Sequence, residues 1–176
     1  MRKSRKWLII AAALLLVLGI GATIAYLVSS PATVHNTFTV GNVSITLQET
    51  TGAEYKLAPG VALPKDPTVT VKADSEACWL FVKVEKEPAL DAFCTYEIQS
   101  QWTPLPGQNG VYYCQAAKAD TDQVYSILAD NRVTVKDTVT EQALAAMTPY
   151  PTMKFTAYAI QSEGISTAED AWQALS

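Results

Sequence analysis

The feature that most constrains this chain is an uncharged apolar run from Trp7 to Tyr26, which follows the basic start "MRKSRK". A helix needs about 20 such residues to cross the hydrocarbon core of a bilayer. The run ends in the small residues "GIGATIA", where a signal peptidase can read Thr23 and Ala25. The pattern predicts a signal peptide over residues 1–25 with cleavage before Tyr26, and an uncleaved signal anchor is the alternative. In both cases the rest of the chain is exported.

The exported part is acidic. Of the 13 Lys and Arg and 17 Asp and Glu residues, four bases and no acids precede residue 26, which leaves nine bases against 17 acids, a net charge of −8. A surface of this sign repels phosphate backbones, so nucleic-acid binding is not expected. About 150 residues remain after export, which is the usual size of a single domain.

The sequence after residue 40 predicts strands separated by turns. In "VSITLQE", Val43, Ile45 and Leu47 alternate with polar residues, as in a strand with one buried face. The Gly41-Asn42 pair before it is consistent with either a tight hairpin or a bulge in one long strand. Further strand-like segments are 67–73, 77–87, 93–102, 110–116, 123–128, 131–137 and 151–163.

Turn residues between these segments organise them further. The turn "TPLPGQNG" predicts a hairpin between 93–102 and 110–116, and the proline-rich segment 55–67 is expected to run irregularly over the surface. Many short strands with proline and glycine in the turns predict a mainly β fold, an antiparallel sandwich of two sheets over residues 41–176.

Two short helices are expected within this pattern. The segment 140–147, "TEQALAAM", is rich in good helix formers. In "STAEDAWQAL", Thr167 is the predicted N-cap, with Asp170 three residues later. Trp172 lies on the apolar face of this second helix and is expected to form a lid on the edge of the sandwich.

The three cysteines allow more than one arrangement. Cys78 alternates with apolar residues in "EACWLFVKVE" and is interpreted as a small buried hydrophobe. This leaves Cys94 and Cys114 as the candidate disulfide, with three reduced thiols as the alternative, because spacing cannot establish proximity.

Residues that could carry chemistry are few. His35 is the only histidine, so the chain cannot build a two-histidine zinc motif, and a histidine-dependent nucleophile would rely on that residue alone. The acidic segments "ADSE" at 73–76 and "ADTD" at 119–122 lack the pattern of a calcium loop and are interpreted as solvated turns. The sequence also contains no phosphate-binding loop and no nucleophile elbow. We therefore expect a protein without catalytic residues, metal or cofactor.

A family resemblance adds to this reading. The segments "GIGATIAYLVSSPATVHNTFTVGNVSITLQE", "KDPTVTVKADSEACWLFVKV", "ILADNRVTVKD" and "FTAYAIQSEGISTAEDAW" together resemble exported proteins of Gram-positive bacteria with a SipW-dependent type of signal peptide, the TasA and camelysin family. This resemblance implies a jelly-roll-like β-sandwich that is processed by a dedicated signal peptidase. In the TasA branch it also implies polymerisation, in which the freed N-terminal segment of one subunit fills a strand position in its neighbour.

Carried over to this chain, the resemblance makes residues 26–40 a candidate donor strand. An extended segment that adds to an open sheet edge pairs its backbone groups and places alternate side chains in apolar pockets. The expected pocket-filling residues are Tyr26, Val28, Val34, Phe38 and Val40. An intramolecular first strand or a loose tether is the alternative for this segment.

The function expected from these observations is that of an exported, non-enzymatic structural protein. It would be secreted or held at the cell surface, contact the membrane through residues 7–26, and form a homo-oligomer or a biofilm-matrix fibre through its N-terminal strand. One alternative is a membrane-tethered binding or adhesion module that keeps its leader. The other is a camelysin-like surface metalloprotease, for which the sequence supplies no zinc motif.

Overall fold

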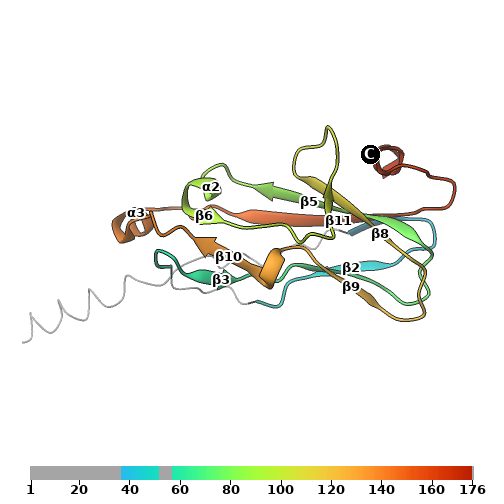
Figure 1. Ribbon diagram of the computed structural model, residues 1–176, viewed down its shortest axis with the longest axis horizontal. Helices are drawn as coiled ribbons and strands as arrows, with labels where there is room; N and C mark the ends of the chain where they lie inside the picture. The colour runs from blue at the N-terminus through green and yellow to red at the C-terminus, as the bar shows by residue number, and fades with distance from the viewer. Residues whose placement is uncertain (1–36, 52–56, 176) are drawn as a thin grey trace, which may run out of the picture.

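The computed structural model describes residues 37–51 and 57–175, and the strands of this part lie in two layers (Figure 1). The chain is mainly β, as predicted, with few short helices. The signal helix predicted over 1–25 and most of the candidate donor strand lie outside the described residues. No helix among the described residues is long and apolar enough to span a membrane.

The larger layer is a five-stranded sheet in the order β1-β11-β5-β8-β7. Its two longest strands pair with each other over nine residues at the centre, where β-branched and aromatic residues are dense. The strands are β1 (Thr37–Val40), β5 (Cys78–Lys86), β7 (Thr103–Pro104), β8 (Val111–Ala116) and β11 (Met153–Gln161).

The second layer consists of two three-stranded sheets placed end to end. One contains β2 (Ile45–Gln48), β4 (Thr68–Val71) and β9 (Gln123–Ser126), and the other contains β3 (Ala62–Pro64), β6 (Cys94–Thr95) and β10 (Arg132–Val135). Backbone hydrogen bonds continue between them, since Ile127 N–H donates to Pro67 O at 3.0 Å and Lys65 N–H donates to Asn131 O at 2.8 Å. Pro64 and Pro67 have no N–H to donate, which explains why the ladder is interrupted here.

The main core lies between the two layers. Alternate residues of β5 point inward, and they pack against inward residues of β2, β4 and β11. Fully buried members of this core are Val69, Cys78, Leu80, Val82, Ile127, Leu128, Ala157 and Ala159. A domain of this size gains most of its stability from such burial.

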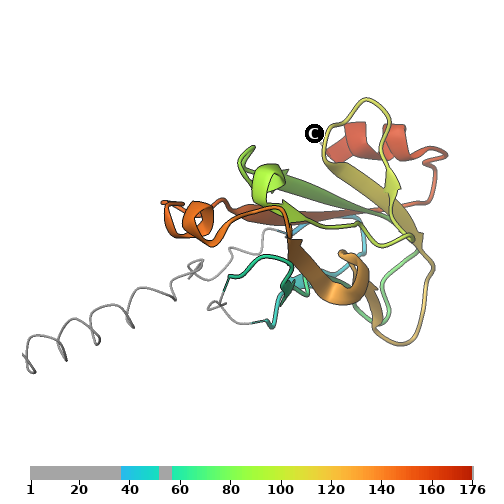
Figure 2. The ribbon, with the colours of Figure 1, turned by 60° about the vertical axis from the view of Figure 1, so that its left-hand side comes forward.

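A second apolar cluster lies on the outer face of the five-stranded sheet. Trp79 and Phe81, the outward residues of β5, pack there with Tyr113, Tyr158 and the helix α4 (Ala168–Leu175). Figure 2 shows α4 over this layer, with α3 (Glu141–Ala145) at the opposite end of the molecule. A third cluster, formed by Leu63, Val135 and Leu144, closes the end that carries α3.

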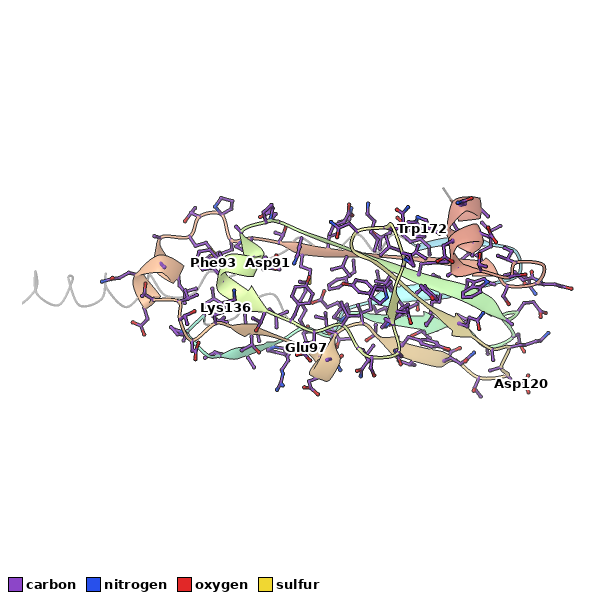
Figure 3. The ribbon with its side chains drawn as sticks, turned by 45° about the horizontal axis from the view of Figure 1, so that its top comes forward. Asp91, Phe93, Glu97, Asp120, Lys136 and Trp172 are labelled. Carbon is purple, nitrogen blue, oxygen red and sulfur yellow. The ribbon has the colours of Figure 1, made fainter. Side chains whose placement is uncertain are left out.

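Both predicted helices are present and both are capped. Asp170 N–H donates to the Thr167 hydroxyl at 3.1 Å, which confirms Thr167 as the N-cap, and Ala143 N–H donates to the Thr140 hydroxyl at 3.2 Å. Two further elements were not predicted from the sequence: the short helix α2 (Leu90–Phe93) and the 3₁₀ turn η1 (Ala129–Asn131). Trp172 covers the outer sheet face rather than the edge for which it was predicted (Figure 3).

The strand connections differ from the prediction in three places. The hairpin predicted at the turn before 110–116 is present, but its first strand is the short β7, within the predicted turn, and not 93–102, whose β6 pairs with β10 in the other layer. The segment predicted as irregular, 55–67, contains β3, which pairs with β10. Gly41-Asn42 is neither a hairpin nor a bulge, since β1 and β2 belong to different sheets and the chain changes layer between them.

Candidate assembly edge

The candidate site for self-assembly is the edge of the large sheet formed by β1. β1 pairs with β11 in parallel, with Thr37 opposite Ala157 and Val40 opposite Ile160. This is the one parallel pairing among the described strands, where an antiparallel arrangement was predicted. No described strand lies on the other side of β1, so half of its backbone groups face outward.

The side chains in the C-terminal half of β1 contribute little to its attachment. Thr39 is exposed and Val40 is 48% exposed, and neither belongs to an apolar core cluster. The backbone ladder to β11 is therefore the principal contact of the C-terminal half of β1. A strand held in this way is easier to exchange than one whose side chains are buried, because its release exposes little apolar surface.

The chain leaves β1 through a tightly packed turn. Gly41 has φ +86°, and a Cβ at this position would lie 2.8 Å from both Cβ and Oε1 of Gln161. The same Oε1 accepts a hydrogen bond from Asn42 N–H at 3.4 Å, and Gln161 Nε2 donates to Glu163 Oε2 at 3.2 Å. Gln161 thus covers the turn at which the chain leaves β1.

Beyond this turn the chain is fixed to the neighbouring loop. Glu76 N–H donates to Asn42 O at 3.0 Å, Ser44 N–H donates to the Ser75 hydroxyl at 3.1 Å, and Lys72 N–H donates to Ser44 O at 2.9 Å. Ser75 is buried, so this contact also satisfies a polar group inside the fold. The chain is anchored from residue 42 onward, and β1 is the part before this anchor.

Several other sheet edges are obstructed. Pro104 in β7 and Pro64 in β3 cannot donate backbone hydrogen bonds, and β6 contains only two residues. At the edge of β9, the Ser126 carbonyl accepts hydrogen bonds from the Trp102 indole at 2.8 Å and the Gln101 amide at 3.1 Å. Among the described strands, β1 and β2 are the edges that carry none of these features.

The structure covers only part of the predicted assembly segment and none of the cleavage site. Thr23, Ala25, Tyr26, Val28 and Val34 lie outside the described residues, as does His35. Phe38 lies in β1 opposite Tyr158. Val40 fills no pocket within its own chain, because it is half exposed. Sequence reasoning missed Gln161, which no local pattern connects with Gly41.

The three cysteines are free. Cys94 lies in β6 and Cys114 in β8, so the predicted pair is split between the two layers and is not bonded in the structure. Cys78 is fully buried, as predicted. Burial raises the pKa of Cys78 to about 11, and burial together with the nearby Cys78 raises that of Cys114 to about 12. Both thiols are therefore protonated and unreactive near neutral pH.

The two acidic turns lie side by side at one end of the sandwich, where Asp120 is labelled in Figure 3. Asp122 accepts hydrogen bonds from Lys72 Nζ and from Ala73 N–H, both at 2.9 Å, and these lower its pKa. Lys118 Nζ lies 2.7 Å from Glu76 Oε1. Backbone and lysine partners thus occupy Asp122 and Glu76, and no group of three or more potential metal ligands is found among residues 37–51 and 57–175.

No family model, no curated protein and no solved structure matches this chain. The candidate site therefore depends on the geometry of β1 and on the sequence that leads into it.

Proposed function

We propose that this protein is an exported, non-enzymatic structural subunit that joins to further copies of itself through residues 26–40. The observation that carries the proposal is the position of β1. It is an edge strand in which Thr39 and Val40 are exposed, and it directly continues the segment that would be freed by cleavage before Tyr26. Export by the N-terminal signal helix and a cell-surface or matrix location belong to the same proposal.

The assembly step follows from edge pairing. Residues 26–40 of one copy add to the sheet edge of the next copy. The backbone N–H and C=O groups of this segment then form hydrogen bonds to the edge strand instead of to water. If β1 itself leaves its own sheet, the nine-residue strand β11 offers the vacated position to the incoming copy. Each subunit then gives one strand and receives one, which produces an open chain when the contact is head-to-tail.

The proposal also includes the jelly-roll-like arrangement implied by the family resemblance. In its favour, the chain changes layer at most of its strand connections. The β2–β4 pairing within one layer is a local departure from that pattern.

The first test is the N-terminus of the protein isolated from its source. Mass spectrometry should find a chain that starts near Tyr26. An intact Met1 would instead favour the second candidate, a membrane-tethered binding module.

The second test compares two purified chains by electron microscopy. Residues 26–176 should form filaments, and residues 41–176, which lack the complete candidate segment, should not. Circular dichroism serves as the control, because both chains must retain a β-rich spectrum. Equal filament formation by the two folded chains would refute assembly through residues 26–40.

A further inference from the structure

The turn that leads into β8 contains the only Asn-Gly pair of the sequence, Asn109-Gly110. The two residues form the middle of a turn that is closed by a hydrogen bond from Val111 N–H to Gln108 O. This bond measures 3.4 Å, which is long for such a contact, so the turn is held loosely. Asn109 is exposed, and the turn stands away from the large sheet at the tip of the β7–β8 hairpin (Figure 1). Water therefore reaches the Asn109 side chain.

The glycine of this pair is required by the fold. Gly110 has φ +73°, and a Cβ at this position would lie 2.6 Å from Val84 O. The Gly110 carbonyl also accepts a hydrogen bond from Val84 N–H at 2.8 Å. A side chain at position 110 would disturb this contact between β5 and the start of β8. The residue after Asn109 is thus fixed as the one type that leaves its backbone nitrogen unshielded.

The two groups that would react with each other are not held by hydrogen bonds. Neither the side-chain amide of Asn109 nor the N–H of Gly110 has a hydrogen-bond partner in the part of the chain that the structure describes. An amide nitrogen without a partner and a neighbouring side-chain amide in water are the two components of an intramolecular attack. Holding both on adjacent residues makes this attack unimolecular.

We propose that Asn109 is a site of spontaneous deamidation, and that its isoaspartate product loosens the start of β8. The Gly110 nitrogen bonds to the carbon of the Asn109 side-chain amide and gives its proton to solvent, while the side-chain nitrogen leaves as ammonia. The product is a five-membered cyclic imide. Water then opens this ring at one of its two carbonyls, which gives either aspartate or isoaspartate. One water is consumed and one ammonia is released, and a neutral side chain becomes a carboxylate.

The two products differ in their effect on the hairpin. In isoaspartate the main chain runs through the side-chain carbons, so it gains one carbon–carbon bond of about 1.5 Å. Gly110 O is bonded to Val84 N–H, and Leu105 N–H donates to Val111 O at 2.9 Å, so the added length strains the junction of β8 with β5. Leu105 and Val111 are both buried in the outer aromatic cluster. Aspartate at position 109 adds the charge without the extra bond.

The first test is peptide mapping by mass spectrometry of the purified protein after several weeks of storage, folded, at neutral pH. The tryptic peptide 87–118 contains Asn109 as its only asparagine, and a growing fraction of it should gain about 1 Da. The peptide 119–132 is the internal control and should keep its mass, because its asparagine, Asn131, precedes Arg132 in β10.

Asn109→Gln should abolish the mass gain of peptide 87–118 within this period. It should leave urea unfolding unchanged, since no described residue forms a hydrogen bond with the Asn109 side chain. A peptide 87–118 that keeps its mass in the folded protein, or that gains mass only in urea, would overturn the proposal.

The second test isolates the aged molecules by anion exchange and identifies isoaspartate with an isoaspartate-specific methyltransferase. The isoaspartate fraction should unfold at a lower urea concentration than fresh protein. Asn109→Asp is the matched control, because it carries the same added charge on an unaltered main chain, and it should unfold like fresh protein. Equal unfolding midpoints for the isoaspartate fraction and Asn109→Asp would refute the effect on β8.

Discussion

Gly41 lies so close to Gln161 that a side chain at position 41 would overlap the Gln161 side chain. A Cβ there would lie 2.8 Å from the Cβ of Gln161, and the backbone has φ +86°. This contact lies where the chain leaves β1 and passes to the other layer. It marks where β1 ends and where the part of the chain anchored by hydrogen bonds to the neighbouring loop begins.

Gly41→Ala should destabilise the fold by about 2 kcal/mol, because the left-handed conformation and the overlap with Gln161 both oppose a side chain. Gly107→Ala is the matched control, since Gly107 has φ +72° and nothing within 4 Å of the added Cβ. It should cost about 1 kcal/mol, the conformational part alone. Urea unfolding measures both values, and equal losses would show that the Gln161 contact contributes nothing.

Asp66 predicts a pH dependence of stability. Burial acts to raise its pKa, but hydrogen bonds from the hydroxyl and backbone N–H groups of Thr50 and Thr51 outweigh this and lower the pKa to about 2. Three of these bonds, from Thr50 N–H, Thr51 N–H and the Thr51 hydroxyl, measure 2.9 Å each. They hold the chain just after β2 against the start of β4.

Since the pKa is lower in the folded state, Asp66 stabilises the fold above its ordinary value of 3.8, and this stability is lost as the pH falls toward 2. We expect a loss of about 1 kcal/mol, because partial exposure weakens these hydrogen bonds. Unfolding by urea at pH 5 and at pH 2 measures it. Asp66→Asn should reduce the difference between the two pH values, and a variant with the wild-type difference would contradict the assignment.

The positions of the strands were predicted from the sequence more accurately than the pairings between them. Alternation placed Val43, Ile45 and Leu47 correctly in the core, because one buried face leaves a period of two in any strand. It could not show that β6 pairs with β10 rather than with β8, since the choice of a partner strand distant in the sequence leaves no local pattern. β3 was missed for a related reason, because a three-residue edge strand next to prolines has the composition of a loop.

The candidate site was predictable only in part. Residues 26–40 were predicted as a candidate donor strand, with an intramolecular first strand as the alternative, but the parallel pairing of β1 with β11 joins distant parts of the chain, and no local signal reports this.

Trp172 predicts how strongly α4 is attached. Its ring lies 5.2 Å from that of Phe81 and 5.1 Å from that of Tyr158, measured between centroids. Trp172→Ala should cost about 2–3 kcal/mol, toward the lower end for a large aromatic side chain because this residue is half-buried. Trp172→Phe should lose less than half as much. Urea unfolding gives both values, and a cost below about 0.5 kcal/mol would show that α4 is not held by this contact.

The cysteines give the last prediction. With all three thiols free, titration in denaturant should detect three thiols per chain, in protein isolated without reductant. In the folded state Cys78 should be the slowest to react, because its side chain is fully buried and a reagent cannot reach its sulfur until the fold opens. Cys94 is only partly buried and should react first, and Cys114, which is also partly buried, should follow more slowly because its pKa is raised to about 12. A single thiol in denaturant would show instead that two cysteines pair after export. Peptide mapping would then identify the pair, and a bond between Cys94 and Cys114 would require the two layers to approach at β6 and β8 more closely than they do in this structure.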